Sequence, residues 1–288
     1  MMERVLFTEP DRGGKPRINF IKGHGTGNDF VILPDPDGAL EPTPALVAAL
    51  CDRHRGIGAD GVLRVVRSAK HPEAEWFMDY RNADGSIAEM CGNGVRVVAR
   101  YLVDNGLAVP GATGLPIATR AGVVVAVVGS PTISVRMAPP SGYAGSTATV
   151  GQLSLPGIAV DCGNPHLVCR LPDGVDLDTL DLHAAPGFDP AVFPDGVNVE
   201  FVSPVASGGG PHVRMRVYER GSGETLSCGS GALAAGAVAL RDAGLGAGTV
   251  VVDVPGGRLT VRHEGDDWWL AGPAVLVATG EVDPEALG

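Results

Sequence analysis

The sequence predicts a two-domain α/β protein with many short strands, few helices and at least one helix enclosed by a sheet. The first observation is a repeat: Met90-Cys91-Gly92-Asn93-Gly94 returns as Ser227-Cys228-Gly229-Ser230-Gly231, 137 residues later (228 minus 91). A period this long means two equivalent units of ordinary domain size, because solenoid repeats are far shorter. The second observation is that residues 229–240 carry no charge. A helix that is apolar all round is buried, which places this one inside a wrapped sheet.

The repeat extends upstream of the cysteines. Gly27-Asn28-Asp29 is matched by Gly163-Asn164-Pro165, so the asparagine precedes its cysteine by 63 residues (91 minus 28) and by 64 (228 minus 164). Asp60-Gly61-Val62 is similarly matched by Asp195-Gly196-Val197. The whole domain is therefore duplicated, and not only the cysteine motif.

The elements follow from local signals in chain order. Strands are predicted where β-branched or alternating runs lie between Gly and Pro, at 17–22, 122–128 and 249–254. Helices are predicted at 44–54, started by Thr43-Pro44, at 92–104 before Gly106, and at 229–243 before Gly244. Residues 1–17 are expected to form a poorly ordered N-terminal extension, with folded structure beginning near Ile18.

Composition excludes several classes of function. With 33 acidic and 22 basic residues the net charge is -11, which argues against nucleic-acid binding. No apolar run reaches the roughly 20 residues of a membrane span, and the charged segment 1–17 is not a signal peptide. Five cysteines without a Cys-x-x-Cys motif then indicate the cytoplasm.

The remaining cysteines favour ordinary packing. Cys162, His166 and Cys169 have a spacing compatible with zinc, but the two cysteines fall in predicted strands, 159–162 and 167–169, and a fourth ligand is missing. Cys51 lies in the first predicted helix, where a small apolar residue suits the core. No metal site is predicted.

Cys91 and Cys228 each stand where a glycine-rich turn enters a helix, and the helix dipole stabilises a thiolate there. A nucleophilic hydrolase would pair one cysteine with a histidine, and a redox pair is usually a close local motif. Inversion of a stereocentre instead needs a base on one face and an acid on the other. A thiolate and a thiol fit that requirement, since they exchange roles in the reverse direction.

The intermediate carbanion also needs stabilisation. Two helix N-termini offer backbone N–H groups to an α-carboxylate, from Gly92, Asn93, Gly229 and Ser230. A pyridoxal phosphate enzyme would need a Schiff-base lysine, and the three lysines of the chain, Lys15, Lys22 and Lys70, are not in a convincing setting. The residues therefore predict an amino-acid racemase or epimerase that needs no cofactor.

The chain resembles the diaminopimelate epimerase family. The resemblance rests on segments spread from Ile18 onward: Gly23-His24-Gly25-Thr26-Gly27-Asn28-Asp29-Phe30, Arg81-Asn82-Ala83-Asp84-Gly85-Ser86, Met90-Cys91-Gly92-Asn93-Gly94, Gly163-Asn164-Pro165-His166, Asp195-Gly196-Val197-Asn198 and Tyr218-Glu219-Arg220-Gly221-Ser222-Gly223-Glu224-Thr225 with Cys228-Gly229-Ser230-Gly231.

The resemblance implies an α/β fold of the α+β type, with two pseudo-symmetric domains, each a curled, mostly antiparallel sheet around a central helix. The active site would lie in the cleft between domains 18–135, with a return segment 274–288, and 136–273. The implied activity is interconversion of LL-2,6-diaminopimelate and its meso form, on the route to lysine and peptidoglycan, without metal or organic cofactor. A homodimer acting on a small amino acid is implied.

The family's site residues carry over by motif. Cys91 and Cys228 match the acid-base pair, and His166 and Glu219 match the residues that tune it, since a nearby carboxylate raises a thiol pKa and a charged imidazole lowers it. The remaining matches imply a clamp on the substrate, particularly its distal end, formed by Asn28, Asn82, Asn164, Asn198 and Arg220. The family often has Gln where this chain has Gly61, so one side-chain contact is lost.

Two alternatives remain open. A proline or hydroxyproline racemase shares the paired cysteines, but typically has His at the position of Asn93 and has no need to hold a distal ammonium and carboxylate. A catalytically idle binding module is the alternative from another class. Retention of both Cys91 and Cys228 argues against it.

Overall fold

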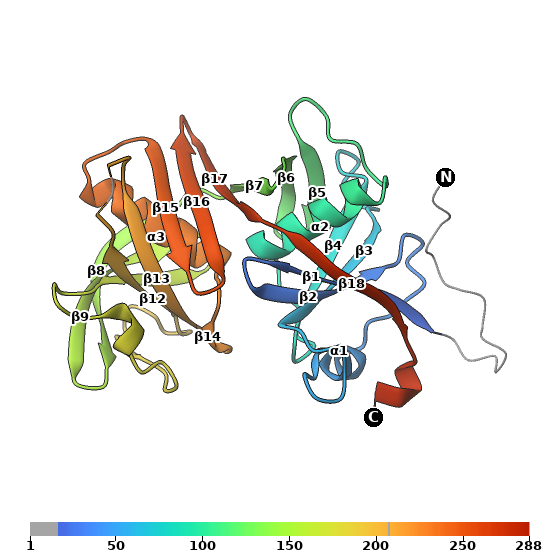
Figure 1. The fold of residues 1–288 in the computed structure, drawn as a ribbon, viewed down its shortest axis with the longest axis horizontal. Helices are drawn as coiled ribbons and strands as arrows, with labels where there is room; N and C mark the ends of the chain where they lie inside the picture. Colours follow the sequence, from blue (N-terminus) through green and yellow to red (C-terminus); the bar gives the residue numbers. More distant parts are fainter. Residues whose placement is uncertain (1–16, 207, 288) are drawn as a thin grey trace. The chain divides into compact units, whose positions relative to one another are not determined.

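The fold is described from a computed structural model, which covers residues 17–206 and 208–287. The chain divides into two compact units (Figure 1). Unit 1 comprises the described residues up to Gly25, residues 29–135 and those from Ala274 onward, and unit 2 comprises residues 26–28 and 136–273. Except for Arg17, the predicted N-terminal extension lies outside the described residues.

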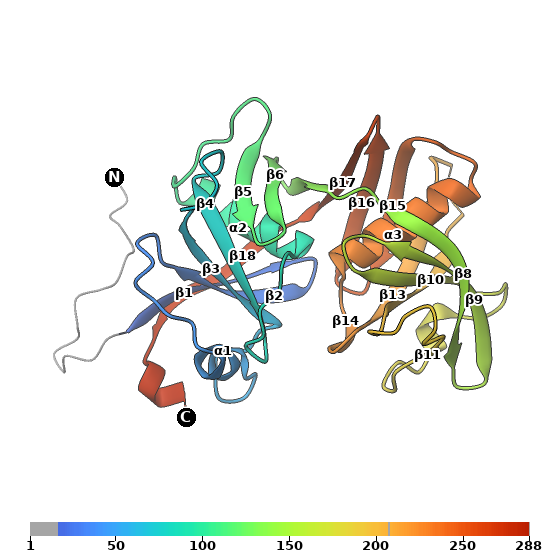
Figure 2. The same ribbon diagram turned by 180° about the vertical axis from the view of Figure 1, so that it is seen from behind.

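Unit 1 is a curled sheet with two helices, seen from behind in Figure 2. Helix α2 packs against β1, β3, β4, β5, β6 and β18, and most of its residues are buried. The elements are β1 (Ile18–Gly25), β2 (Asn28–Pro34), α1 (Pro44–Cys51), β3 (Gly61–Arg67), β4 (Trp76–Asn82), α2 (Gly92–Asp104), β5 (Leu115–Thr119), β6 (Gly122–Val128), β7 (Thr132–Met137), β18 (Val275–Val282) and the 3₁₀ turn η2 (Pro284–Leu287).

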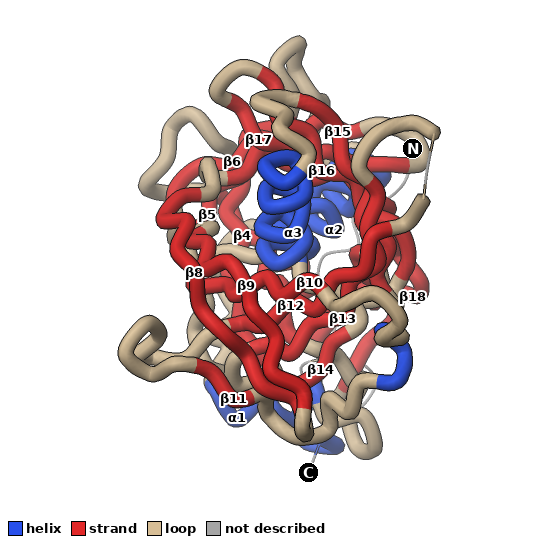
Figure 3. The backbone as a smooth tube through the Cα atoms, turned by 90° about the vertical axis from the view of Figure 1, so that its left-hand side faces the viewer, coloured by secondary structure: helices blue, strands red, loops and turns tan. Residues whose placement is uncertain are grey.

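Unit 2 repeats this plan around helix α3, which runs through the curl of its sheet (Figure 3). Helix α3 packs against β9, β10, β12, β13, β15, β16 and β17. The elements are β8 (Ser141–Val150), β9 (Leu153–Asp161), β10 (Pro165–Arg170), η1 (Leu177–Thr179), β11 (Gly187–Phe188), β12 (Asn198–Pro204), β13 (His212–Glu219), β14 (Gly223–Thr225), α3 (Gly229–Asp242), β15 (Gly248–Val254), β16 (Gly257–Glu264) and β17 (Asp267–Pro273).

The strand pairings show that the units are equivalent. In unit 1, β2 is parallel to β3, β3 antiparallel to β4, β4 parallel to β5 and β5 antiparallel to β6. In unit 2, β10, β12, β13, β15 and β16 repeat the same alternation in the same order. The predicted fold class, a duplicated α/β fold with curled sheets around a helix, is confirmed.

The predicted helices are confirmed with small differences at their ends. The first ends at Cys51 rather than near His54, because Asp52 caps it and its carboxylate accepts the backbone N–H groups of His54 and Arg55. Helices α2 and α3 end just before Gly106 and Gly244, which have φ values of 65° and 69° that favour glycine.

Close packing explains why α3 is built from small residues. A Cβ added to Gly236 would lie 2.7 Å from the Cβ of Val261 on β16, so the helix lies directly against the sheet there. The buried residues of α3 include Leu233, Ala237 and Leu240. The prediction that residues 229–240 form a buried helix inside a wrapped sheet is confirmed.

Candidate active site

Cys91 is the N-cap residue of α2 in unit 1. Its backbone is extended, with φ of -142° and ψ of 115°, and its Sγ accepts the backbone N–H of Gly94 at 3.4 Å. The thiol is half-buried, at the end of the helix where the dipole is positive. Gly92 and Asn93 are buried in the first turn of α2. The predicted cysteine helix start is therefore present in this unit.

One turn further along α2 lies Arg96, whose side chain is fully buried. Burial lowers the pKa of this guanidinium to about 10, while the neighbouring Cys91 acts in the opposite direction. Arg96 Nη2 would be 3.1 Å from a Cβ on Gly25 of β1, so the absence of a side chain there leaves room for the guanidinium. Arg96 was not predicted from the sequence as a site residue.

Cys228 caps α3 in the same way in unit 2. Its φ is -112° and its ψ 120°, and its Sγ accepts the backbone N–H of Gly231 at 3.4 Å. Ser230 Oγ lies 3.5 Å from the same sulfur. The thiol is 6% exposed, and Gly229 is buried beside it.

The surroundings of Cys228 favour its protonated form. Burial raises the pKa of the Cys228 thiol well above its ordinary value, and the carboxylates of Glu219 and Glu200 raise it further. The hydrogen bonds from Ser230 and Gly231 act in the opposite direction. Glu219 ends β13, and its Oε1 accepts the hydroxyl proton of Thr225 on the neighbouring β14. Glu219 is one of the residues that the family resemblance predicts to tune the thiols, whereas Glu200 was not predicted from the sequence.

His166 and Glu200 form a buried pair beneath the start of α3. His166 lies on β10 and Glu200 on the parallel strand β12, with Nδ1 2.7 Å from Oε1, and both side chains are inaccessible to solvent. Burial raises the pKa of Glu200, whereas the charge and hydrogen bond of His166 lower it. A Cβ on Gly231 would lie 2.5 Å from Glu200 Oε1, so this carboxylate contacts the turn that caps Cys228.

The second ring nitrogen of His166 lies 2.9 Å from Oδ1 of Asn164. In this arrangement Oδ1 of Asn164 accepts a hydrogen bond from the ring. If Glu200 is ionised, both ring nitrogens of His166 carry a proton. If Glu200 is protonated, its O–H donates to Nδ1 of His166. Both states hold the same number of protons and have no net charge. His166 thus influences the first turn of α3 through Glu200.

Two of the predicted asparagine ligands, Asn82 and Asn198, make hydrogen bonds to nearby turns and strands. Asn82 donates to Ser86 Oγ at 3.0 Å, and Asn198 donates to the Pro165 carbonyl at 3.0 Å while accepting the N–H of Arg220 at 3.0 Å. These amides brace turns and strand ends. Asn28 and Asn93 are 9% and 1% exposed.

Arg220 begins the turn after β13 and has an exposed side chain. Its Nη1 donates to the Asp195 carbonyl at 3.0 Å, and its Cδ would be 2.9 Å from a Cβ on Gly196. The stem therefore lies across this turn, where the φ of Gly196 is 84°. The turn positions the guanidinium and leaves it accessible to a ligand.

Gly61, where the family resemblance implied the loss of a side-chain contact, is sterically closed. A Cβ there would lie 2.6 Å from the Arg81 carbonyl oxygen and 2.8 Å from the ring of Tyr80. The Tyr80 ring packs edge-on against Phe30 with centroids 6.0 Å apart. An aromatic pair thus occupies the space that a longer side chain at Gly61 would need.

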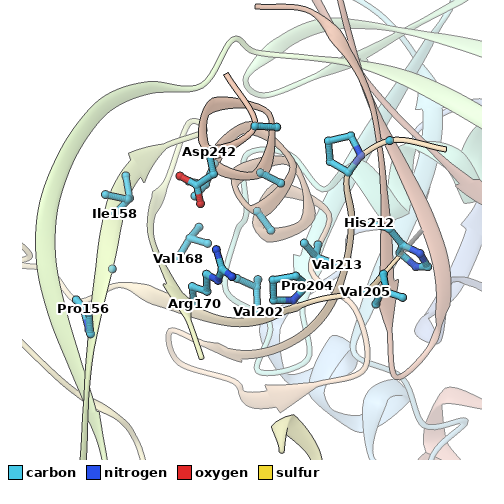
Figure 4. Close-up of a pocket in the computed structure, with 18 residues that line it drawn as sticks. Pro156, Ile158, Val168, Arg170, Val202, Pro204, Val205, His212, Val213 and Asp242 are labelled. Atoms are coloured by element: carbon cyan, nitrogen blue, oxygen red, sulfur yellow. The ribbon is translucent and has the colours of Figure 1, made fainter. Parts of the chain in front are cut away.

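Unit 2 also has a pocket of about 540 Å³ beside the second half of α3 (Figure 4). Apolar side chains of β10, β12 and α3 line it, with Arg170, His212 and Asp242 as its charged or titratable members. None of the predicted site residues contributes to it. Its distance along α3 from Cys228 separates it from the cysteine chemistry.

The described residues contain no group of three or more His, Cys, Asp and Glu arranged to hold a metal ion. None of the five cysteines, all of which lie in the described residues, forms a disulfide, and Cys51, Cys162 and Cys169 are buried. Burial raises the pKa of Cys51 to about 12, as it also does for Cys169. Cys51 packs with Val47 and Leu50, as the core assignment predicted.

Solved structures with the same fold define the class of protein. A Bacillus anthracis phenazine biosynthesis protein of the PhzF family matches with a TM-score of 0.66 at 18% identity, covering 92% of this chain and 99% of that chain. A hydroxyproline epimerase from Agrobacterium vitis also gives a TM-score of 0.66, at 17% identity, covering 94% of this chain and 95% of that chain. The chain thus has the duplicated α/β fold of the PhzF and proline-racemase-like proteins.

Sequence relatives identify the family within this class. The model of the family described as Diaminopimelate epimerase matches residues 20–141 and 158–283. A diaminopimelate epimerase from Mycolicibacterium smegmatis is 49% identical over 286 residues, covering 92% of this chain and 97% of that protein. One from Streptomyces coelicolor is 51% identical over 285 residues, covering 93% and 96%. The chain belongs to the diaminopimelate epimerase family.

Proposed function

We propose that this protein is an isomerase that interconverts LL-2,6-diaminopimelate and meso-diaminopimelate by a two-base mechanism. The observation that carries the proposal is the pair of N-cap cysteines, Cys91 and Cys228, on equivalent helices of equivalent units. Its substrate assignment is supported by relatives about half identical over more than nine-tenths of the chain, all called diaminopimelate epimerases. The proposed reaction places the enzyme in lysine and peptidoglycan biosynthesis.

In this mechanism the substrate α-carbon lies between the two sulfurs. One thiolate removes the α-proton, forming an S–H bond as the C–H bond breaks, and the opposite thiol donates its proton to the other face of the carbon. Charge develops on the α-carboxylate as the proton leaves. The first-turn N–H groups of α2 and α3 stabilise that charge, from Gly92, Asn93, Gly229 and Ser230.

The distal amino-acid end of the substrate supplies specificity. Arg220 would form a bidentate contact with the distal carboxylate, aided by the amides of Asn28, Asn82, Asn164 and Asn198. The proposal includes an active site between domains 18–135 (with 274–288) and 136–273. His166 and Glu219 would tune the thiols. Mechanism and motif both support catalysis without metal or organic cofactor.

The proposal also covers the setting of the enzyme. We expect a cytoplasmic homodimer that binds no nucleic acid and no membrane, on the basis of the family resemblance and the net charge of -11. In the described part of the chain, no helix has the length and apolar character needed to cross a membrane.

The test is α-proton exchange in deuterated water, with LL-diaminopimelate and proline compared side by side and no added cofactor. We expect deuterium at the α-carbon of diaminopimelate, with formation of the meso isomer, and none in proline. Exchange into proline alone would assign the protein to the proline racemase alternative, and exchange into neither would remove the proposed reaction.

A further inference from the structure

The two cysteine sites share a backbone frame but have different residues beneath it. A Cβ on Gly94, the third residue of α2, would lie 3.0 Å from Leu63 on β3, whereas on Gly231, the third residue of α3, it would lie 2.5 Å from Glu200 on β12. Leu63 and Glu200 are 137 residues apart, the same interval as the cysteines. An aliphatic side chain in unit 1 is therefore replaced by a carboxylate in unit 2.

The partner of this carboxylate is replaced as well. On the strand before, Phe30 pairs with Gly61 in unit 1, and His166 pairs with Asn198 in unit 2. Because residues 61 and 198 are also 137 apart, Phe30 and His166 occupy equivalent places. All four side chains, Phe30, Leu63, His166 and Glu200, are fully buried. The apolar pair of one unit is a polar pair in the other.

Within the helices themselves, the charged side chain is in unit 1 and the apolar one in unit 2. Arg96 is the fifth residue after Cys91, and the fifth residue after Cys228 is Leu233. Both side chains have no exposed surface. Buried positive charge therefore occurs at the start of α2, and buried carboxylate at the start of α3.

We propose that Arg96 and Glu200 give the two cysteines different protonation states, so that in the resting enzyme Cys91 is the thiolate and Cys228 the thiol. We call this difference the polarity of the cysteine pair. This inference deepens the proposed function and rests on it for its catalytic consequence. Arg96 and Glu200 are positioning residues and not catalytic residues, since each acts on the protonation state of a cysteine sulfur and not on the substrate. The sequence repeat alone would give two equivalent thiols.

The physical basis is the sign of the nearest buried charges. Arg96 favours the thiolate form of Cys91, because the guanidinium is fully buried and little water screens its positive charge. Around Cys228 the charged groups are Glu219 and Glu200, and both oppose ionisation of its thiol. His166 partly compensates Glu200, but the oxygen nearest the turn of Gly231 belongs to the carboxylate.

The test measures how readily each cysteine is alkylated, because only the thiolate reacts. The intact protein is treated with iodoacetamide between pH 6 and pH 10, and Cys91 and Cys228 are quantified separately by mass spectrometry. The pH at half-maximal rate is compared for each cysteine, so that slower access of the reagent to the buried Cys228 sulfur does not decide the result. We expect this midpoint to be lower for Cys91.

Substitutions then identify the cause. Arg96→Met should raise the midpoint of Cys91 alkylation by about one pH unit and leave Cys228 unchanged, and Glu200→Gln should speed Cys228 alkylation at pH 7 by about tenfold, equivalent to a fall of roughly one unit in its midpoint. Leu233→Met, at the place in α3 equivalent to Arg96, is the matched control and should change neither. Should Arg96→Met fail to fold, Glu200→Gln alone decides the question.

The outcomes separate this inference from the proposed function. Equal midpoints in the wild type, or midpoints that do not move in Glu200→Gln, would overturn the polarity even if the protein epimerises diaminopimelate. A clear polarity in a protein that exchanges no α-proton of diaminopimelate would sustain the charge assignment and reject the proposed substrate.

Discussion

The first turns of α2 and α3 are nearly identical in backbone and differ in buried charge. In both, the cysteine caps the helix and accepts the N–H of the glycine three residues on, at 3.4 Å. Beneath these turns, unit 1 has Leu63 and Arg96 where unit 2 has Glu200 and Leu233. Duplication thus supplies matched geometry for two faces of a substrate, while a few buried substitutions give the two sulfurs different electrostatic surroundings.

The Gly-Asn motifs differ in a related way. Asn28 is followed by Asp29, which forms ion pairs with Lys22 and Arg53, whereas Asn164 is followed by Pro165. The carbonyl of Pro165 accepts a hydrogen bond from Asn198. One motif is therefore held by charges and the other by a rigid residue and an amide. Equivalent backbones do not need equivalent side-chain support.

The largest expected effect tests whether both halves are needed. Cys91→Ala and Cys228→Ala should each lower the rate of diaminopimelate epimerisation by about a hundredfold to ten-thousandfold, because each removes the proton carrier for one face. Steady-state kinetics measures this, with circular dichroism as the control for folding. A single variant with near wild-type turnover would contradict the two-base mechanism.

The next effect concerns stability and the buried pair of unit 2. His166→Phe introduces the residue found at the equivalent place in unit 1 and leaves the Glu200 carboxylate without its ring partner. Breaking a buried pair costs about 3 to 5 kcal/mol in the free energy of unfolding. The double variant His166→Phe, Glu200→Leu recreates the apolar pair and should recover most of that loss, as measured by urea unfolding. A double variant less stable than His166→Phe would show that the units are not interchangeable here.

Arg220 tests an asymmetry in substrate binding. The residue 137 positions earlier is Ala83, so only unit 2 offers a guanidinium at this turn. Arg220→Ala should lower kcat/KM for LL-diaminopimelate by an amount equivalent to about 2 to 5 kcal/mol, if the ligand desolvates a charged pair. Arg220→Lys should recover little, because an ammonium lacks the planar fork.

The control for Arg220 is Arg214→Ala, which removes an exposed ion pair with Asp178 in the same unit. We expect this control to retain wild-type kinetics, since exposed pairs contribute little. Unchanged kcat/KM in Arg220→Ala would mean that Arg220 does not hold the substrate.

The helix starts could be predicted because their causes are local. A cysteine followed by Gly-x-Gly and an apolar run is enough to set the N-caps of α2 and α3, and the glycines at 106 and 244 set their ends. Cys51 could likewise be assigned to the core from its helix alone. Hydrophobic periodicity and helix caps are therefore enough to predict this part of the fold.

The electrostatic surroundings of the cysteines could not be predicted in this way. Glu200 meets His166 only because β10 and β12 pair in parallel across 34 residues of sequence, and Gly61 is closed only because the neighbouring strand β4 places the Arg81 carbonyl and the Tyr80 ring against it. One signal was present in the sequence: Glu200 is a lone charge in the strand Asn198-Val199-Glu200-Phe201-Val202, at the repeat position of Leu63. A charge in a buried strand is rare unless it is paired.

The smallest expected effect tests the ionic support of the first Gly-Asn motif. Burial raises the pKa of Asp29, but hydrogen bonds and charges of Arg53 and Lys22 lower it more, from 3.8 to about 2. Because the folded-state pKa is depressed, the stabilisation is present above about pH 4 and is lost as the pH falls towards 2. Asp29→Asn removes it at every pH.

We therefore expect Asp29→Asn to lower the free energy of unfolding at pH 7 by about 1 to 2 kcal/mol, allowing for screening of the half-exposed Arg53. Urea unfolding from pH 7 to pH 3 should show this difference shrinking as the solution becomes more acidic. Asp178→Asn, which removes an exposed carboxylate of unit 2, should behave like the wild type throughout. A deficit in Asp29→Asn that stays constant down to pH 3 would assign the role of Asp29 to the hydrogen bond that its carboxylate accepts from the backbone N–H of Asp60 rather than to its charge, since replacing the carboxylate alters that contact equally at every pH.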